Sequence, residues 1–175
     1  AAWQDRFWKS PDYESGLAFW REQLAGLEPL DLPTDHARRS VRTGRGDTCA
    51  FSVPAATLAG LQDLEQRSGA TLFMVLYAAT LLVLSRHSGQ KDIALGTVTS
   101  GRDHVGLENV VGFFVNTIAP RIAVDEDEDL LTLVGRVRDR LLDAFQHADI
   151  PFDSVVDAIS PARDPSRPTL VQALI

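Results

Sequence analysis

Apolar residues recur at helical spacing along several stretches of the chain. The clearest stripe predicts an amphipathic helix over residues 130–145, because its apolar side chains fall on one face. The members of this stripe are Leu130, Leu133, Val134, Val137, Leu141 and Phe145. Residues 72–86 are apolar on nearly every side, so we expect that helix to be buried. Three further helices are predicted, over residues 10–26, 54–69 and 151–159.

Runs rich in β-branched and aromatic residues predict the strands. One is expected over 47–53, with the single cysteine, Cys49, as a small buried side chain in it. A buried strand over 93–98 follows a Ser-Gly-Gln turn, and a loop feeds another strand within 110–124. A last strand is expected over 170–175. This mixture of helices and strands favours an α/β fold.

The composition is that of a globular protein, with 45% apolar and 23% charged residues among 175. The formal net charge of −7 weighs against nucleic-acid binding, although residues 38–46 form a basic, glycine-containing loop. One cysteine excludes an internal disulfide, and no apolar run reaches the length of a membrane helix. Met74 is the only methionine, so we expect the chain to be part of a longer polypeptide. We predict a cytoplasmic protein without a metal site, because none of the four histidines has ligand spacing.

Two polar sites stand out in apolar surroundings. Ser100, Gly101 and Arg102 follow a predicted strand, where small residues allow either close approach of a ligand or another backbone segment, or simply a tight turn. Asn116 interrupts an apolar segment, and a buried amide must find hydrogen-bond partners. It either ties down a backbone bend or faces a substrate channel. The five acidic residues over 125–129 are interpreted as a turn and helix cap rather than a cation site.

Several segments resemble, in order, the core motifs of nonribosomal peptide synthetase condensation domains. They are Trp3-Gln4, Phe19-Trp20-Arg21-Glu22-Gln23-Leu24, Leu32-Pro33-Thr34-Asp35, Thr71-Leu72-Phe73, the stretch 88–97, Gly101-Arg102, Val111-Gly112-Phe113-Phe114-Val115-Asn116-Thr117, His147-Ala148-Asp149-Ile150-Pro151-Phe152 and Arg163-Asp164-Pro165-Ser166-Arg167. The chain departs from the family at Ala148, where glutamine is usual, and at Pro168-Thr169, where Asn-Pro is usual. Chance matches do not keep order and spacing, so the chain resembles this family over essentially its whole length.

The resemblance implies the chloramphenicol acetyltransferase-like fold, in which two lobes form a V with a tunnel between them. Residues 1–46 would connect to the N-terminal lobe, and residues 47–175 would form an incomplete C-terminal lobe. It also implies amide-bond formation between aminoacyl and peptidyl thioesters, which donor and acceptor peptidyl carrier proteins present on phosphopantetheine. No cofactor is expected to bind directly, and an adjoining adenylation domain is an expected partner.

The same resemblance implies roles for individual residues. Near the tunnel, lining or bracing it, we expect Ser100, Gly101, Arg102, Asn116 and Thr117. Expected structural motif residues are Trp3, Gly112, His147, Asp149, Pro151, Phe152, Arg163, Asp164, Ser166 and Arg167. Among these, His147 is interpreted as standing at the start of the helix at Pro151.

The family's catalytic motif, His-His-x-x-x-Asp-Gly, is expected upstream of these residues. No two adjacent histidines occur in the 175 residues, so the isolated chain is predicted to be inactive. Two alternatives stay open. One is an epimerisation or heterocyclisation domain on the same fold, and the other is a non-catalytic module that recruits carrier proteins or partner enzymes.

Overall fold

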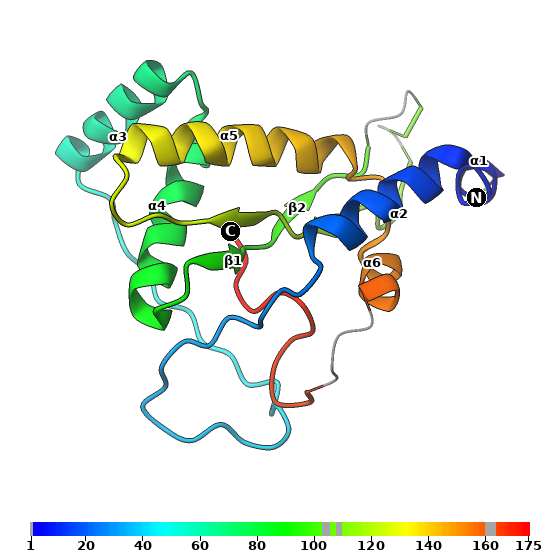
Figure 1. Ribbon diagram of the computed structural model, residues 1–175, viewed down its shortest axis with the longest axis horizontal. Helices are drawn as coiled ribbons and strands as arrows, with labels where there is room; N and C mark the ends of the chain where they lie inside the picture. Colours follow the sequence, from blue (N-terminus) through cyan, green and yellow to red (C-terminus); the bar gives the residue numbers. More distant parts are fainter. Residues whose placement is uncertain (1, 103–105, 108–109, 160–163) are drawn as a thin grey trace.

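The structure is a computed structural model that describes residues 2–102, 106–107, 110–159 and 164–175. Over these residues helices and short strands are mixed, as the α/β prediction requires (Figure 1). The helices are α1 (Ala2–Phe7), α2 (Pro11–Gln23), α3 (Ala55–Ser68), α4 (Leu72–Ser88), α5 (Leu130–Gln146) and α6 (Phe152–Ile159). The strands are β1 (Asp92–Ala94), β2 (Thr97–Thr99), β3 (Asn116–Ile118) and β4 (Arg121–Ala123).

The strands form two antiparallel pairs. β1 pairs with β4 and places Ile93 opposite Ile122, whereas β2 pairs with β3 and places Val98 opposite Thr117. Both β3 and β4 lie within the stretch 110–124, where a loop feeding a strand was expected. In the β2–β3 pair Thr99 stands opposite Asn116, so the segment after β2 and the segment before β3 leave the pair at the same end. The predicted site residues lie at this end.

The predicted strand over 93–98 is divided into β1 and β2. At the division, Gly96 donates its amide to the carbonyl of Ala173 (2.9 Å) and accepts from the amide of Ile175 (3.0 Å). The C-terminal segment thus forms one isolated parallel bridge with the sheet. The prediction of a regular strand over the last six residues is wrong, because Leu170 adopts a positive φ of 67° and turns the chain before it can extend along the sheet.

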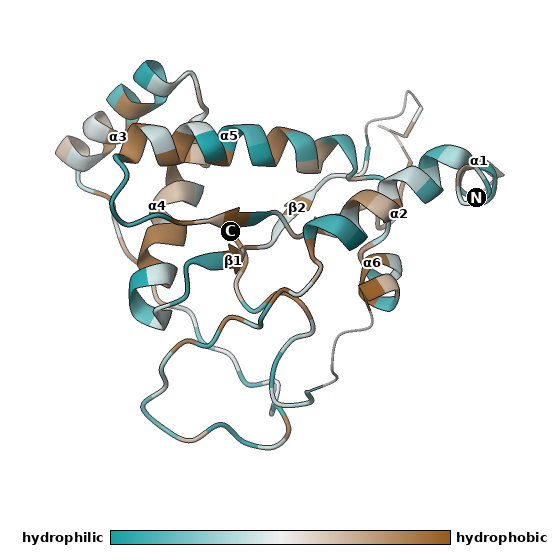
Figure 2. Cartoon of the chain, viewed as in Figure 1, coloured by the Kyte–Doolittle hydropathy of each residue, from teal (hydrophilic) through white to brown (hydrophobic). Residues whose placement is uncertain are grey.

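The larger hydrophobic core lies between α4, α5 and the β1–β4 pair. Leu81 of α4 belongs to it together with Val134 and Leu141 of α5, and all three are fully buried. Tyr77 is also buried, and its hydroxyl donates to the carbonyl of Leu95, which satisfies the phenol. Burial raises the pKa of the Tyr77 phenol above its usual value. In Figure 2, α5 shows brown and teal residues along its length, as its predicted amphipathic stripe requires.

A second core joins α2 and α6 to the β2–β3 pair. Trp20 and Leu24 of the α2 region contribute to it, together with Ile118 of β3 and Val155 of α6. Trp20 is only 2% exposed, so truncating it to alanine would remove about 3–5 kcal/mol of stability. Helix α2 is therefore part of the same folded body as the later elements.

The predicted helix boundaries are supported by their caps. The side chains of Ser10, Thr71 and Asp129 each accept from the amide three residues later, at 3.3, 3.3 and 3.0 Å. Gly69 and Gly89 end α3 and α4 in the left-handed conformation that glycine favours. Asp129 is the last residue of the acidic run, so the interpretation of that run as a turn and cap is confirmed.

The prediction of a strand over 47–53 is wrong for this structure. The segment has no regular secondary structure, and it pairs with no strand among the described residues. Cys49 is exposed rather than buried, and Phe51 is 85% exposed. Apolar residues do alternate at Cys49, Phe51 and Val53, yet a strand is stabilised only when a neighbour completes its ladder.

α3 was predicted correctly, although none of its residues is buried. Leu61 and Leu64 pack at the margin of the larger core. Within the described part of the chain, no single helix is long and apolar enough to cross a membrane. Only α3 and α4 taken together have the necessary length and apolar composition, and they are bent by 108° where they meet.

Candidate functional site

A hollow of about 670 Å³ opens between α1, the segment before β3 and the connection from α5 to α6. Five aromatic side chains contribute to its wall: Trp3, Phe7, Trp8, Phe113 and Phe114. Its volume lies within the range of about 300–1,000 Å³ that is typical of small-molecule sites. The hollow also brings together five residues that the sequence analysis singled out, namely Trp3, Gly101, Asn116, Asp149 and Pro151.

One wall of the hollow is α1, which the sequence analysis did not predict. Six residues are too few to show a helical period. The helix is held by aromatic contacts, since Trp3 stacks on Phe7 with ring centres 5.3 Å apart, and Phe7 meets the edge of Tyr13 at 5.8 Å. Trp3, predicted to be a structural motif residue, thus supports the aromatic wall.

Asn116 fixes the opposite wall. Its Nδ2 donates to the carbonyls of Ala148 (2.8 Å) and Ile150 (2.7 Å), and its Oδ1 accepts from the amide of Phe152 (3.1 Å). All three partners belong to the connection between α5 and α6 or to the first residue of α6. Asn116 therefore ties down a backbone bend, which was one of the two open interpretations, and it does so while lining the hollow. Pro151 sits in the bend itself, directly before α6.

Gly101 is required by its conformation and its surroundings. Its φ is +61°, and a Cβ at this position would lie 2.0 Å from the carbonyl oxygen of Phe114. Glycine here permits two backbone segments to touch, which is the close approach of another backbone segment that was one of the interpretations open from the sequence. Gly112 is similarly enclosed, because a Cβ there would lie 2.9 Å from the ring of Phe114.

Arg102 organises the segment that leads into β3. Its guanidinium donates to the carbonyls of Leu107 (2.5 Å), Val110 (2.9 Å) and Gly112 (3.3 Å). The same group lies over the ring of Phe114, 4.5 Å from the ring centre. The hydrogen bonds from Arg102 hold this backbone segment in place. The cation–π contact with Phe114 adds about 0.5–1 kcal/mol of stability, as is typical of an exposed site.

Ser100 and Thr117 are neighbours of the hollow but not part of the wall described above. Ser100 is exposed, and its hydroxyl accepts from the amide of Arg102 (3.4 Å). Thr117 stands opposite Val98 in the β2–β3 pair. The five predicted tunnel residues therefore gather at one end of this pair, and Gly101 and Asn116 are the two that line the hollow.

His147 lies at the end of α5 rather than at the start of the next helix, so that part of its interpretation is wrong. Its imidazole stacks on Phe19 with ring centres 3.9 Å apart, and its carbonyl accepts from Nε1 of Trp20 (3.1 Å). Both contacts join α5 to α2. Helix α5 continues to Gln146 because Pro151, which has no backbone N–H to donate, lies beyond its last turn.

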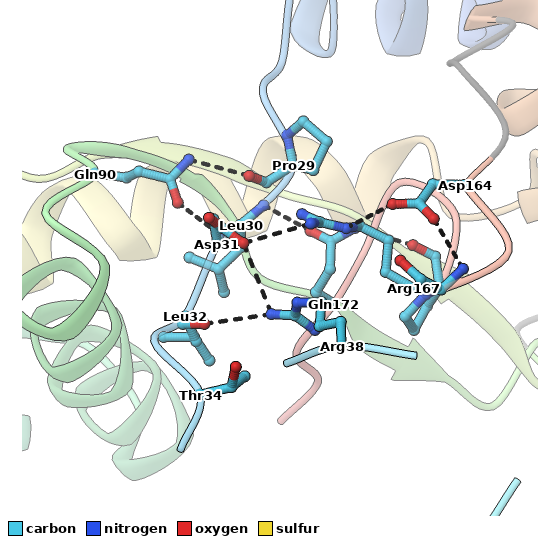
Figure 3. A network of polar contacts seen from close by, with 12 residues as sticks. Pro29, Leu30, Asp31, Leu32, Thr34, Arg38, Gln90, Asp164, Arg167 and Gln172 are labelled. Atoms are coloured by element: carbon cyan, nitrogen blue, oxygen red, sulfur yellow. Dashed lines mark hydrogen bonds and ion pairs between the residues drawn. The ribbon is translucent and has the colours of Figure 1, made fainter. Parts of the chain in front are cut away.

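A polar network joins three distant motifs (Figure 3). Gln90 accepts from the amide of Asp31 (2.7 Å), and Gln172 accepts from the amide of Leu30 (2.7 Å). Gln90 also donates to the carbonyl of Pro29 (3.1 Å). The segment after α2 is thus held by one glutamine from the loop after α4 and one from the C-terminal segment.

Arg167 completes this network. It forms ion pairs with Asp164 (3.0 Å) and Asp31 (3.4 Å). Asp164 also accepts from the amide of Ser166 (2.8 Å). Hydrogen bonds from Ser166, aided by the charge of Arg167, hold the pKa of the Asp164 carboxyl below its usual value. These contacts place Asp164, Ser166 and Arg167 together at the start of the C-terminal segment. Arg163, predicted alongside them, lies outside the described residues.

The sequence analysis missed the contribution of Gln90 and Asp31. Gln90 was noted only within a turn and a family motif, Asp31 was not singled out, and the two residues lie 59 positions apart in the chain. No local pattern connects such positions, so the hydrogen bond between them emerges only from the fold.

The chemistry available in the hollow is that of binding and orientation. The aromatic and aliphatic side chains of its walls favour contact with an apolar group. Over the described residues, no group of three His, Cys, Asp or Glu side chains could hold a metal ion. Asp149 is the acidic residue of the wall, and the amide of the Asn116 side chain is already engaged with backbone.

Several known proteins are similar to this chain in sequence. A plipastatin synthase of Bacillus subtilis (strain 168) is 41% identical over 175 residues, which are 99% of this chain and 7% of that protein. Tyrocidine synthase 3 of Brevibacillus parabrevis is 39% identical over 168 residues, which are 95% of this chain and 3% of that protein. The chain therefore spans only a small part of these curated relatives.

Solved structures of nonribosomal peptide synthesis proteins are similar to this chain as well. A four-domain nonribosomal peptide synthetase bound to AMP and glycine matches 93% of this chain with 30% identity and a TM-score of 0.86, over 12% of that chain. The X-domain in its complex with OxyB from teicoplanin biosynthesis matches 99% of this chain with 27% identity and a TM-score of 0.91, over 39% of that chain. The family model described as the condensation domain matches residues 1–175. The chain therefore belongs to the condensation domain family of nonribosomal peptide synthetases and has its fold.

Proposed function

We propose that this chain forms one wall of a substrate tunnel in a condensation domain that joins carrier-bound aminoacyl and peptidyl groups through an amide bond. The observation that carries the proposal is the aromatic hollow of about 670 Å³, which is lined largely by residues of the family motifs. Family membership and the peptide synthases among the relatives support the same reaction.

In the proposed reaction, the acceptor amine attacks the carbonyl carbon of the donor thioester. The carbon–sulfur bond breaks, the amide bond forms, and the donor carrier keeps its free thiol. The contribution of this chain is to hold the reacting groups together, and such positioning can supply about 7–11 kcal/mol of a barrier. Gly101, Arg102 and Asn116 keep the wall rigid by fixing the two segments that form it.

The catalytic histidine motif of the family has no counterpart in these residues, since no two histidines are adjacent. We therefore expect the 175 residues on their own to form no amide bond. The complete domain would contain an N-terminal lobe, reached through residues 1–46, and a C-terminal lobe that includes residues 47–175. Phosphopantetheine would arrive on donor and acceptor carrier proteins, and an adenylation domain would adjoin, all in the cytoplasm.

A second candidate is a module that recruits a partner enzyme. The observation behind it is the match to the X-domain, solved in complex with OxyB, which has a TM-score of 0.91 over 99% of this chain. Sequence identity favours the first candidate, at 41% to the plipastatin synthase. An intact His-His-x-x-x-Asp-Gly motif in the same domain would support amide formation, and a degenerate motif would support recruitment.

Site-directed labelling tests the proposed tunnel wall. In a complete domain carrying Cys49→Ser, which removes the exposed thiol of these 175 residues, we would introduce Val115→Cys at the hollow and Thr57→Cys on α3 as the control. A loaded acceptor carrier protein should slow the reaction of a thiol reagent at position 115 but not at position 57. Equal rates at both positions, with and without the carrier, would contradict the tunnel assignment.

A further inference from the structure

The loop over residues 38–46 carries a concentration of positive charge that the proposed tunnel does not use. Four of its nine residues are arginines, none is acidic, and the whole chain has a net charge of −7. The four arginines are Arg38, Arg39, Arg42 and Arg45. Figure 1 shows this loop extending away from the helices, well separated from α1.

The loop has a defined shape. The amide of Arg42 donates to the carbonyl of Pro165 (3.2 Å), which attaches the loop to the C-terminal segment. Gly44 turns the chain with a φ of +67°, and the amide of Arg45 donates to the hydroxyl of Thr43 (3.4 Å). The four arginines, Val41 and Ser166 border a shallow depression of about 620 Å³. The charges are therefore displayed around a common surface.

The described residues neutralise little of this charge. Arg38 approaches Asp31 at 3.7 Å and donates to the carbonyl of Leu32 (3.3 Å). Asp31 is shared with Arg167, which also pairs with Asp164. Among the described residues, Arg39, Arg42 and Arg45 have no acidic partner within 4.0 Å, and all three are exposed.

We propose that the arginine loop, residues 38–46, is a docking site for a carboxylate-rich surface of another protein or domain. Guanidinium groups bind carboxylates through two parallel hydrogen bonds, and the loop contains arginine without lysine. Val41, which is 61% exposed between the arginines, supplies the apolar contact that protein interfaces combine with arginine. The net negative charge of the chain repels a nucleic acid, which is negatively charged along its whole length, more strongly than it repels a protein with a local acidic patch. The inference does not depend on amide formation at the tunnel.

Binding of a fluorescent oligoglutamate peptide to the complete domain provides the test. The variant Arg39→Glu/Arg42→Glu should weaken binding at least about tenfold at low salt. The matched control is Arg86→Glu/Arg140→Glu, which makes the same change in net charge at exposed positions of α4 and α5 and should bind within about twofold of the unchanged domain. The difference should shrink at about 0.3 M NaCl, because salt screens exposed charges.

Three outcomes would overturn the proposal. One is that the unchanged domain does not bind the peptide, and another is that both double variants lose the same affinity. The third is that inorganic phosphate or a DNA duplex binds to the domain instead of the peptide, and that Arg39→Glu/Arg42→Glu abolishes this binding. That result would identify a phosphate site. Circular dichroism of each variant verifies that the domain is folded. Amide formation is assayed separately, so failure of the tunnel proposal would be distinguishable.

Discussion

At the scale of single residues, a few polar side chains fix the geometry of the hollow. Asn116 uses both ends of its amide on backbone groups, and Arg102 uses its guanidinium on carbonyls. Both were selected from the sequence because they interrupt apolar or glycine-rich stretches. Their partners could not be predicted, since Asn116 reaches residues 32–36 positions away and no periodicity spans such a distance.

Replacing Asn116 tests its bracing role. Asn116→Ala leaves two carbonyls and one amide unsatisfied in a partly buried site, which should lower the free energy of unfolding by about 2 kcal/mol or more. Asn116→Asp should cost more, because a carboxylate would face the carbonyls of Ala148 and Ile150. Urea denaturation of the complete domain measures both. If Asn116→Asp matched the unchanged protein in stability, the hydrogen bonds would be assigned wrongly.

A second residue-scale prediction concerns pH. Hydrogen bonds from the amide and then the hydroxyl of Thr132 lower the pKa of Asp129 from its usual 3.8. A carboxyl whose pKa is lowered by folding stabilises the protein above its unfolded pKa, and this contribution is lost as the pH falls through the folded value. Asp129→Asn keeps the cap without the charge, so its stability should fall less steeply below about pH 4.

Urea midpoints at neutral pH and at about pH 3 measure this effect. Asp129→Ala serves as the comparison, because it removes the cap at every pH. Parallel pH profiles for the unchanged protein and Asp129→Asn would mean that this carboxyl does not contribute to acid sensitivity.

At the scale of elements, helices were predicted better than strands. The stripe of α5 and the caps at Ser10, Thr71 and Asp129 are local, so they are visible in sequence. Strands depend on partners that are distant in the chain. The segment 47–53 has a strand-like alternation but no partner among the described residues, and the stretch 93–98 divides because Gly96 bonds to the C-terminal segment.

Two glycine substitutions test this difference between local and distant constraints. Gly101→Ala places a Cβ against the carbonyl of Phe114 at a positive φ, so it should destabilise the domain by about 1–3 kcal/mol or more. Gly60→Ala lies in α3 with open space around it and should stabilise by about 0.5–1 kcal/mol. Thermal unfolding distinguishes them. A neutral Gly101→Ala would contradict the close backbone contact at the hollow.

At the scale of the whole molecule, distant parts of the chain are held together by two hydrophobic cores and by the polar network around Asp31. α2 enters the second core through Trp20, and the segment after it is held by Gln90 and Gln172 (Figure 3). The fold class and family followed from motifs in the sequence. The hollow could not be outlined in advance, because it depends on α1, which is too short to predict, and on contacts between distant segments.

The central claim is that this chain shapes a condensation tunnel without carrying the catalytic group. It is tested most directly by incubating loaded donor and acceptor carrier proteins with the complete domain, or with the 175 residues alone, and measuring the intact mass of the acceptor carrier. We predict amide product with the complete domain and none with the chain alone. Product from the chain alone, or no product from a complete domain with an intact histidine motif, would contradict the account.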